Sequence, residues 1–169
     1  NFYNGSFFGR IISMTKERNK SVPASYLFLK KGEEILLGRR KNTGYYDGWY
    51  GMPAGHVDAK ELPIDAAIRE AKEEVGIDIN PKDIQFAHAL YRTAHDITGD
   101  RSDYFFMVQK WDGESKIMES EKCDDLQWFP IEKLPENTIH HERHAIEKIK
   151  QGISYSEIGV EQTHHNPTK

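Results

Sequence analysis

Three closely spaced glutamates, Glu70, Glu73 and Glu74, are the residues with the clearest chemical potential, and they follow directly on Arg69. Residues three and four positions apart share one face of a helix, so these carboxylates can converge. Like charges at that spacing repel, which favours a bound cation between them. Carboxylate oxygens are hard ligands that suit Mg²⁺ or Mn²⁺. The simpler interpretation is a solvated acidic helix face, balanced by Arg69 and Lys72.

A helix is predicted over residues 63–75, because its start, its apolar face and its end each have a sequence signal. Pro63 suits the first helical position, where the missing N–H has no intrahelical partner to lose. Gly76 suits the left-handed conformation that ends many helices. Apolar residues recur between them at three- and four-residue steps, which predicts one buried stripe. The stripe consists of Ile64, Ala67, Ile68, Ala71 and Val75.

The spacing of charged residues and glycines around this helix resembles the signature of the Nudix hydrolase family. The fixed positions of that signature are matched by Gly55, Glu61, Arg69, Glu70, Glu73, Glu74 and Gly76, followed by the aliphatic Ile77. Seven fixed residues, each at a background of about one in fifteen, give on the order of one chance match in 10⁸ per start point. Ala71 stands where a larger aliphatic residue is more usual, which affects helix packing rather than chemistry.

The resemblance implies a fold, an activity and a cofactor. Nudix enzymes are α/β/α sandwiches around a mixed β-sheet, and they cleave a nucleoside diphosphate linked to another moiety with the help of divalent metal. Independently, the element order read along the chain (strands, a helix, more strands and a second helix) predicts an α+β fold. We therefore expect a Nudix fold that uses Mg²⁺, with Mn²⁺ as an alternative.

The resemblance also implies a role for each matching residue. Metal ligands would be Glu70, Glu73 and Glu74, together with the backbone carbonyl of Gly55, and one of the carboxylates would act as general base for the attacking water. Arg69 would orient Glu70. The catalytic residues implied in this way are Arg69, Glu70 and Glu73. Structural roles fall to Glu61, which would pair with Arg69, and to Gly76.

Composition limits the class of protein. The chain has 169 residues and a formal net charge of −4, which argues against a general nucleic-acid binder. Cys123 is the single cysteine, so no intrachain disulfide forms and a cytoplasmic location fits. No apolar run approaches the roughly 20 residues of a membrane span.

One domain is expected over residues 14–158. Residues 1–13 precede Met14 and are expected to be a remnant foreign to the native chain or, alternatively, a flexible arm that binds a partner. Residues 159–169 form a polar tail. A homodimer through a sheet edge or the N-terminal arm is compatible with the sequence.

Substrate contacts are expected from the segments before the helix. Strands are predicted over residues 22–30, 34–40 and 51–54. Arg39 or Arg40, at the end of the second of these strands, can reach a phosphate, because guanidinium matches phosphate geometry. In the loop at residues 41–50, Tyr45 and Tyr46 are the candidates for stacking on a nucleobase, whereas Trp49 is expected to plug the edge of the core.

Further contacts are expected after the helix. Strands are predicted over residues 83–93, 103–111 and 126–130, and a helix over residues 137–151. In many Nudix enzymes an acidic residue outside the signature completes the metal site, and Glu119 and Glu121 in the acidic loop are the candidates here. Asn137 either contacts a base edge, as in MutT-type enzymes, or caps the helix that follows it.

The favoured activity is hydrolysis of a nucleoside triphosphate to a monophosphate and pyrophosphate, by analogy with MutT-type enzymes of similar size. Nucleotide sugars, dinucleoside polyphosphates and RNA 5′ ends stay open as substrates. A different class of function, a Nudix-derived module that binds a nucleotide without cleaving it, usually lacks some of the acidic residues of the signature. All of them are present here.

Overall fold

A computed structural model describes residues 19–96 and 99–159. The expected arm at residues 1–13 and the tail from residue 160 on lie outside this described part. Its elements in chain order are β1 (Ser21–Lys31), β2 (Glu34–Arg40), β3 (Tyr50–Gly51), β4 (Ala54–His56), α1 (Pro63–Val75), a 3₁₀ turn η1 (Pro81–Asp83), β5 (Ile84–Asp96), β6 (Gly99–Val108), β7 (Cys123–Pro130), α2 (His140–Lys150) and β8 (Tyr155–Ile158).

The strands of the described residues form one mixed sheet in the order β3-β2-β1-β6-β5-β8, with β4 beside β1 and β7 beside β2. The central strand, β1, runs parallel to β6 and antiparallel to β4 and β2. The register aligns Ser25 with Gly55 on β4 and with Tyr104 on β6. This pairing holds β4, which leads to the acidic helix, against the middle of the sheet.

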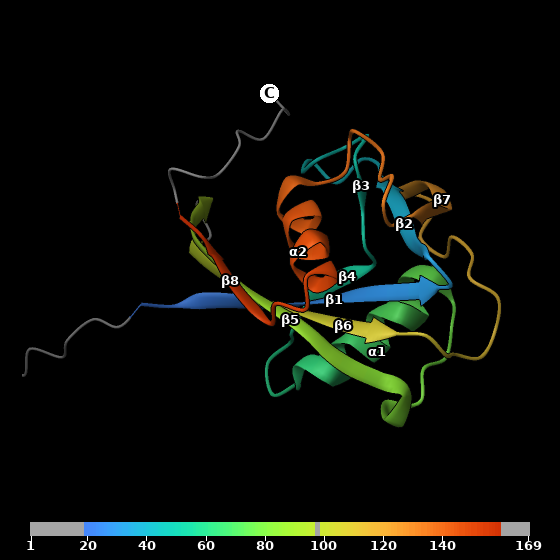
Figure 1. Ribbon diagram of the computed structural model, residues 1–169, viewed down its shortest axis with the longest axis horizontal. Coiled ribbons are helices and arrows are strands. Elements are labelled where there is room, and N and C mark those ends of the chain that lie inside the picture. Colours follow the sequence, from blue (N-terminus) through green and yellow to red (C-terminus); the bar gives the residue numbers. More distant parts are fainter. Residues whose placement is uncertain (1–18, 97–98, 160–169) are drawn as a thin grey trace, which may run out of the picture.

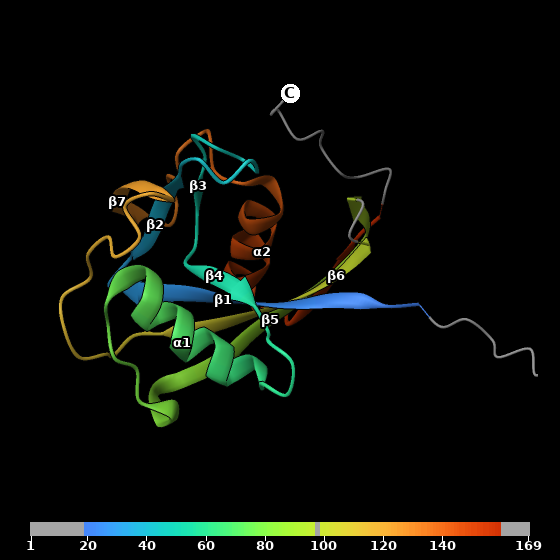
Figure 2. The ribbon, with the colours of Figure 1, turned by 180° about the vertical axis from the view of Figure 1, so that it is seen from behind.

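Two hydrophobic cores lie on opposite faces of the sheet, because successive side chains of a strand point to opposite sides. On β1, Phe28 belongs to the core that includes Ala145 of α2, whereas Leu27 belongs to the core that includes Ala67 of α1. Figures 1 and 2 show the two helices on opposite sides of the strands. The predicted α/β/α sandwich around a mixed sheet is confirmed.

The acidic helix forms where the sequence predicts it. Pro63 occupies its first turn, and Gly76 ends it in the left-handed conformation with φ of 72°. One detail of the predicted stripe is wrong: Ile64 is 41% exposed, and Ala66 is buried instead. The buried residues of the helix are Ala66, Ala67, Ala71 and Val75, all of which follow Ile64.

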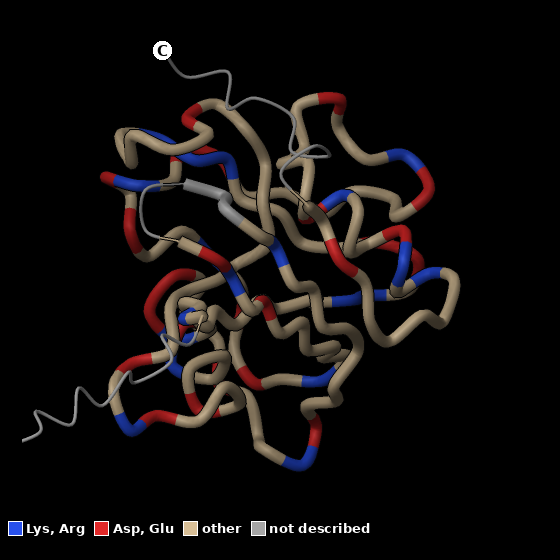
Figure 3. Tube along the Cα trace, turned by 90° about the vertical axis from the view of Figure 1, so that its left-hand side faces the viewer, with Lys and Arg blue, Asp and Glu red and all other residues tan. Residues whose placement is uncertain are grey.

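Several other boundaries differ from the prediction. The strand expected at residues 51–54 is split into β3 and β4, and the expected helix at residues 137–151 begins only at His140. Strand β8 has no counterpart in the prediction; it pairs in parallel with β5, a contact between distant segments that local pattern does not reveal. Acidic and basic residues are distributed along the described part of the trace in Figure 3. Among the described helices, none is long and apolar enough to cross a membrane.

Candidate active site

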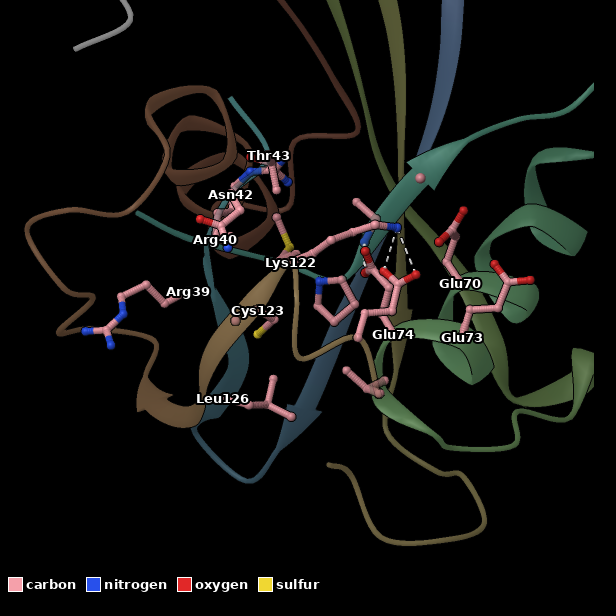
Figure 4. Close-up of a pocket in the computed structure, with 18 of the residues that line it drawn as sticks. Arg39, Arg40, Asn42, Thr43, Glu70, Glu73, Glu74, Lys122, Cys123 and Leu126 are labelled. Carbon is pink, nitrogen blue, oxygen red and sulfur yellow. Dashed lines mark hydrogen bonds and ion pairs between the residues drawn. The ribbon is translucent and has the colours of Figure 1, made fainter. Parts of the chain in front are cut away.

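The three glutamates of α1 line one cavity of about 590 Å³, together with Gly55 and Glu119. Figure 4 shows Glu70, Glu73 and Glu74 extending from the helix on one side of this cavity. Glu119 lies 45 positions after Glu74 in the sequence, in the acidic loop at residues 112–125. The expected fourth carboxylate is therefore beside the other three, whereas Glu121 is exposed and is not among the lining residues.

Arg69 fixes the positions of the surrounding carboxylates. Its Nε and Nη2 donate to the two oxygens of Glu61 at 2.9 and 3.0 Å, and its Nη1 donates to Glu70 at 2.5 Å and to Glu73 at 3.1 Å. Nη2 also donates to the carbonyl of His56 at the end of β4. Such bidentate, charge-assisted bonds are strong and directional. Arg69 thus links α1 to β4 and to the loop between them, which carries Glu61. The resemblance implies the same pairing of Arg69 with Glu61 and Glu70.

Gly55 lies against the carboxylate of Glu70. A Cβ atom on Gly55 would stand 1.8 Å from Oε1 and 2.2 Å from Cδ of Glu70, which no side chain can occupy. Only glycine permits this close approach of the strand backbone to the carboxylate. The neighbouring N–H of Ala54 donates to Glu74 Oε2 at 2.9 Å, so the same short strand contacts two of the three glutamates.

Burial changes the acidity of two of these glutamates. It raises the pKa of Glu74 to about 8, against the lowering effect of the Ala54 hydrogen bond and with a further increase from the charges of Glu70 and Glu119. Burial also raises the pKa of Glu70, opposed by Arg69. Both shifts mean that ionised carboxylates are unfavourable here without a cation.

The residues of this cavity fit a divalent metal ion. Within residues 19–96 and 99–159 no three acidic, His or Cys side chains already converge as a coordination shell. Instead Arg69 bonds Glu70 and Glu73, and Lys122 bonds both oxygens of Glu119 at 2.8 and 3.0 Å. Carboxylates that are crowded, partly buried and held by cationic side chains are a donor set suited to Mg²⁺.

Cationic side chains also line this cavity. They are Arg39, Arg40 and Lys122. Arg39, expected to contact substrate, is held by Asp124 through a 2.7 Å bond and extends away from the glutamates in Figure 4. Arg40 lines the cavity too, while its Nε donates to the carbonyl of Tyr45 at 2.8 Å. A cavity lined by both carboxylates and cationic side chains suits a metal-bound polyphosphate.

One aromatic expectation is wrong in the structure. Tyr46 is only 2% exposed, so it does not fit the predicted stacking on substrate. Its ring packs edge-on against Tyr45 at 4.7 Å and Trp49 at 5.4 Å between ring centres. Trp49, expected to plug the edge of the core, is partly buried and also packs against His140, with 4.9 Å between ring centres. The loop turns back on itself at Tyr46, where φ is 53°, and this turn carries the ring inward.

Asn137 does not cap the helix that follows it. Its Nδ2 donates to the carbonyl of Gly48 at 2.7 Å, so it joins the aromatic loop to the segment before α2. The N-cap position of α2 is Ile139, with no side-chain cap. The predicted cap is therefore wrong, and Asn137 is not among the residues that line the cavity.

A second cavity of about 370 Å³ adjoins the first, and the sequence does not predict it. The two share Arg40, Gly55 and His56. The second cavity extends toward α2 and is also lined by Arg92 of β5 and Glu142 of α2. The available signal in the sequence is a charged residue inside an apolar strand: Arg92 is 3% exposed and forms a buried ion pair with Asp103.

Comparisons with known proteins agree with this geometry. Residues 18–149 match the family model described as NUDIX domain. Among curated proteins, the NAD-capped RNA hydrolase NudC of Stutzerimonas stutzeri is 29% identical over 119 residues, which cover 67% of this chain and 38% of that protein. The ADP-ribose pyrophosphatase of Methanocaldococcus jannaschii is 29% identical over 115 residues, covering 68% and 65%. The chain thus spans well under half the length of the NudC relative.

Solved structures show the same fold. A MutT NUDIX hydrolase from Burkholderia pseudomallei superposes with a TM-score of 0.69 at 24% identity, covering 76% of this chain and 97% of that one. A UDP-X diphosphatase superposes with a TM-score of 0.60 at 18% identity, covering 86% and 71%. The family match over most of the chain, together with a complete acidic signature on one helix, shows that this protein belongs to the Nudix hydrolase family.

Proposed function

We propose that this protein hydrolyses the diphosphate linkage of a nucleoside diphosphate derivative in a reaction that depends on Mg²⁺, with Mn²⁺ as a substitute. The single observation that carries the proposal is that four carboxylates line one cavity, which cationic side chains line as well. The alternative of a binding module without activity is disfavoured because every acidic residue of the signature is retained in the sequence.

The charged side chains at the first cavity have distinct roles in this reaction. Glu70, Glu73, Glu74 and Glu119 would hold the metal, which when bound neutralises phosphate charge and lowers the pKa of water. One carboxylate of this group takes a proton from the attacking water. The water oxygen bonds to one phosphorus of the bridge, and the bond from that phosphorus to the bridging oxygen breaks. Arg69 keeps Glu70 and Glu73 in place, and Arg40 and Lys122 bind phosphate oxygens.

The substrate class follows from the shared chemistry of the relatives. Their names refer to NAD-capped RNA, ADP-ribose and UDP-X, each a nucleoside diphosphate joined to a second group. Nucleoside triphosphates, which the sequence analysis ranks first, also contain such a linkage. A panel of these compounds, with nucleotide sugars and dinucleoside polyphosphates, and with identification of the products, separates pyrophosphate release from monophosphate release.

Two variants test the site. We expect Glu73→Gln and Glu74→Gln to lower turnover by about 100-fold or more, because each removes a metal ligand or the base, while the fold is retained. Glu121→Gln is the matched control, since that residue is exposed in the same acidic loop. Near-normal turnover in both cavity variants would refute the metal-site assignment. A protein silent on the whole panel yet stabilised thermally by a nucleotide would instead be a binding module.

A further inference from the structure

We propose that the second cavity binds an anionic group that the substrate carries outside its scissile diphosphate, and that Arg92 recognises this group. The inference rests on the proposed function, since it assigns a part of the same substrate. It goes beyond that function by requiring a phosphate or carboxylate in addition to the diphosphate that is cleaved.

Arg92 lines this cavity and has one donor that is unpaired within the described part of the chain. Its side chain is 3% exposed and lines the second cavity, and its Nε donates to Asp103 Oδ2 at 2.6 Å. Its Nη1 is buried and has no hydrogen-bond partner among the described residues. A buried polar group without a partner is costly and rare, so a native protein is expected to satisfy it with a ligand or a water.

The wall of the second cavity is rich in cationic groups. Three guanidinium groups line it, from Arg40, Arg92 and Arg101. Among the described lining residues Glu142 is the one carboxylate, and its Oε2 accepts from the N–H of Met52. Burial raises the pKa of Glu142 to about 8, so near pH 7 it is mainly a neutral acid. Guanidinium groups match the geometry of phosphate and carboxylate, which makes an anion the best-suited occupant.

The second cavity adjoins the carboxylate cavity. Ala54, Gly55 and His56 line both, and Gly55 is the residue against which the Glu70 carboxylate lies. A substrate whose diphosphate is at the glutamates can therefore extend past β4 toward α2. The small side chain of Ala24 on β1 leaves this space open on the sheet side.

A water offers a competing explanation. Asp103 Oδ1 is also buried without a partner among the described residues, so one water bridging it to Arg92 Nη1 would satisfy both atoms. In that case Arg92 would be purely structural, and its loss would affect all substrates equally. The two explanations are separated by substrate pairs that differ only in an anionic group.

The experiment uses three such pairs with the full chain and Mg²⁺: NADP and NAD, UDP-glucuronic acid and UDP-glucose, and ATP and ADP. The additional anion is a phosphate on the nucleoside in the first pair, a carboxylate on the second sugar in the second, and a terminal phosphate in the third. For one pair we expect the member with the additional anion to be preferred about 10- to 100-fold in kcat/KM, the effect of a charge-assisted hydrogen bond. Calorimetric binding of both members gives a readout that does not require turnover.

The variants are chosen so that folding does not obscure the result. Removing one partner of a buried ion pair leaves a lone charge, so the pair is removed together as Arg92→Gln with Asp103→Asn. We expect this double variant to abolish the preference, because only the member with the additional anion loses a charge-assisted bond, and to leave the other member within about 3-fold of wild type. Ala24→Leu fills the cavity with the ion pair intact and should selectively weaken the member with the additional anion.

Each outcome decides between the explanations. Hydrolysis or binding without a preference in any of the three pairs overturns the inference and leaves the proposed function standing. An equal loss for both members in the double variant also overturns it, in favour of the bridging water. Absence of hydrolysis for every compound refutes the proposed function instead, and the calorimetric comparison of the pairs then still tests the subsite.

Discussion

Replacing Glu74 with Gln tests the electrostatics of the acidic cavity most directly, because it removes one ionisable group and preserves the shape of the side chain. Burial raises the pKa of Glu74 from an ordinary value of 4.5 to about 8. The folded state therefore binds this proton more tightly than the unfolded chain. The corresponding stability is fully present below a pH of about 4.5 and is lost as the pH rises toward 8.

The magnitude of this loss follows from the two pKa values. A shift of one pKa unit corresponds to about 1.4 kcal/mol, so at pH 7 the buried Glu74 destabilises the metal-free protein by about 3 kcal/mol relative to low pH. Most of that loss, about 2–3 kcal/mol, falls between pH 5 and pH 7. Glu74→Gln cannot ionise and should lack this part of the pH dependence.

Urea denaturation in the presence of a chelator measures the effect. We expect the free energy of unfolding of the wild type to fall relative to that of Glu74→Gln across pH 5 to 7. Near pH 8, saturating Mg²⁺ should restore the free energy of unfolding of the wild type but not raise that of Glu74→Gln. Glu121→Gln serves as the control for loss of a surface carboxylate. If the free energies of unfolding of wild type and Glu74→Gln changed in parallel with pH, burial would not raise the pKa of Glu74.

Two further variants test the packing around the site. Gly55→Ala should lower turnover by about 100-fold with little loss of stability, because its Cβ would stand 1.8 Å from Glu70 Oε1 and displace that carboxylate. Wild-type kinetics in this variant would show that catalysis does not require the Glu70 carboxylate to lie against residue 55. Tyr46→Ala should reduce the free energy of unfolding by about 3 kcal/mol, since the ring is 2% exposed within an aromatic cluster, whereas Tyr46→Phe keeps the ring and should cost less than half as much. Equal stabilities of these two Tyr46 variants in denaturant titrations would contradict the packing argument.

The elements that sequence reasoning locates correctly are those with local causes. Pro63 and Gly76 mark the ends of α1 through backbone conformations that these residues adopt by themselves, and the structure has the helix at those bounds. The strand predicted over residues 22–30 likewise corresponds to β1. The acidic cluster is visible in the sequence because residues three and four apart on one helix are neighbours whatever the rest of the chain does.

The errors concern residues whose environment is set by distant segments. Tyr46 and Trp49 have similar aromatic character, and only the fold of their loop decides that Tyr46 is the buried one. Asn137 is a good helix cap by type, yet it bonds Gly48 because that loop lies beside it. Strand β8 depends on pairing with β5, some sixty residues earlier in the chain.

By itself, the sequence determined the sandwich fold, the family and the identity of the acidic helix, because periodicity, caps and the spacing of charges act over a few residues. Tertiary structure alone decided that Glu119 joins the helix glutamates, that Gly55 lies against Glu70, and that a second cavity opens beside Arg92. These features are contacts between segments far apart in the chain. Burial and charge coupling, which set the chemistry of such contacts, depend on the packed surroundings rather than on local sequence.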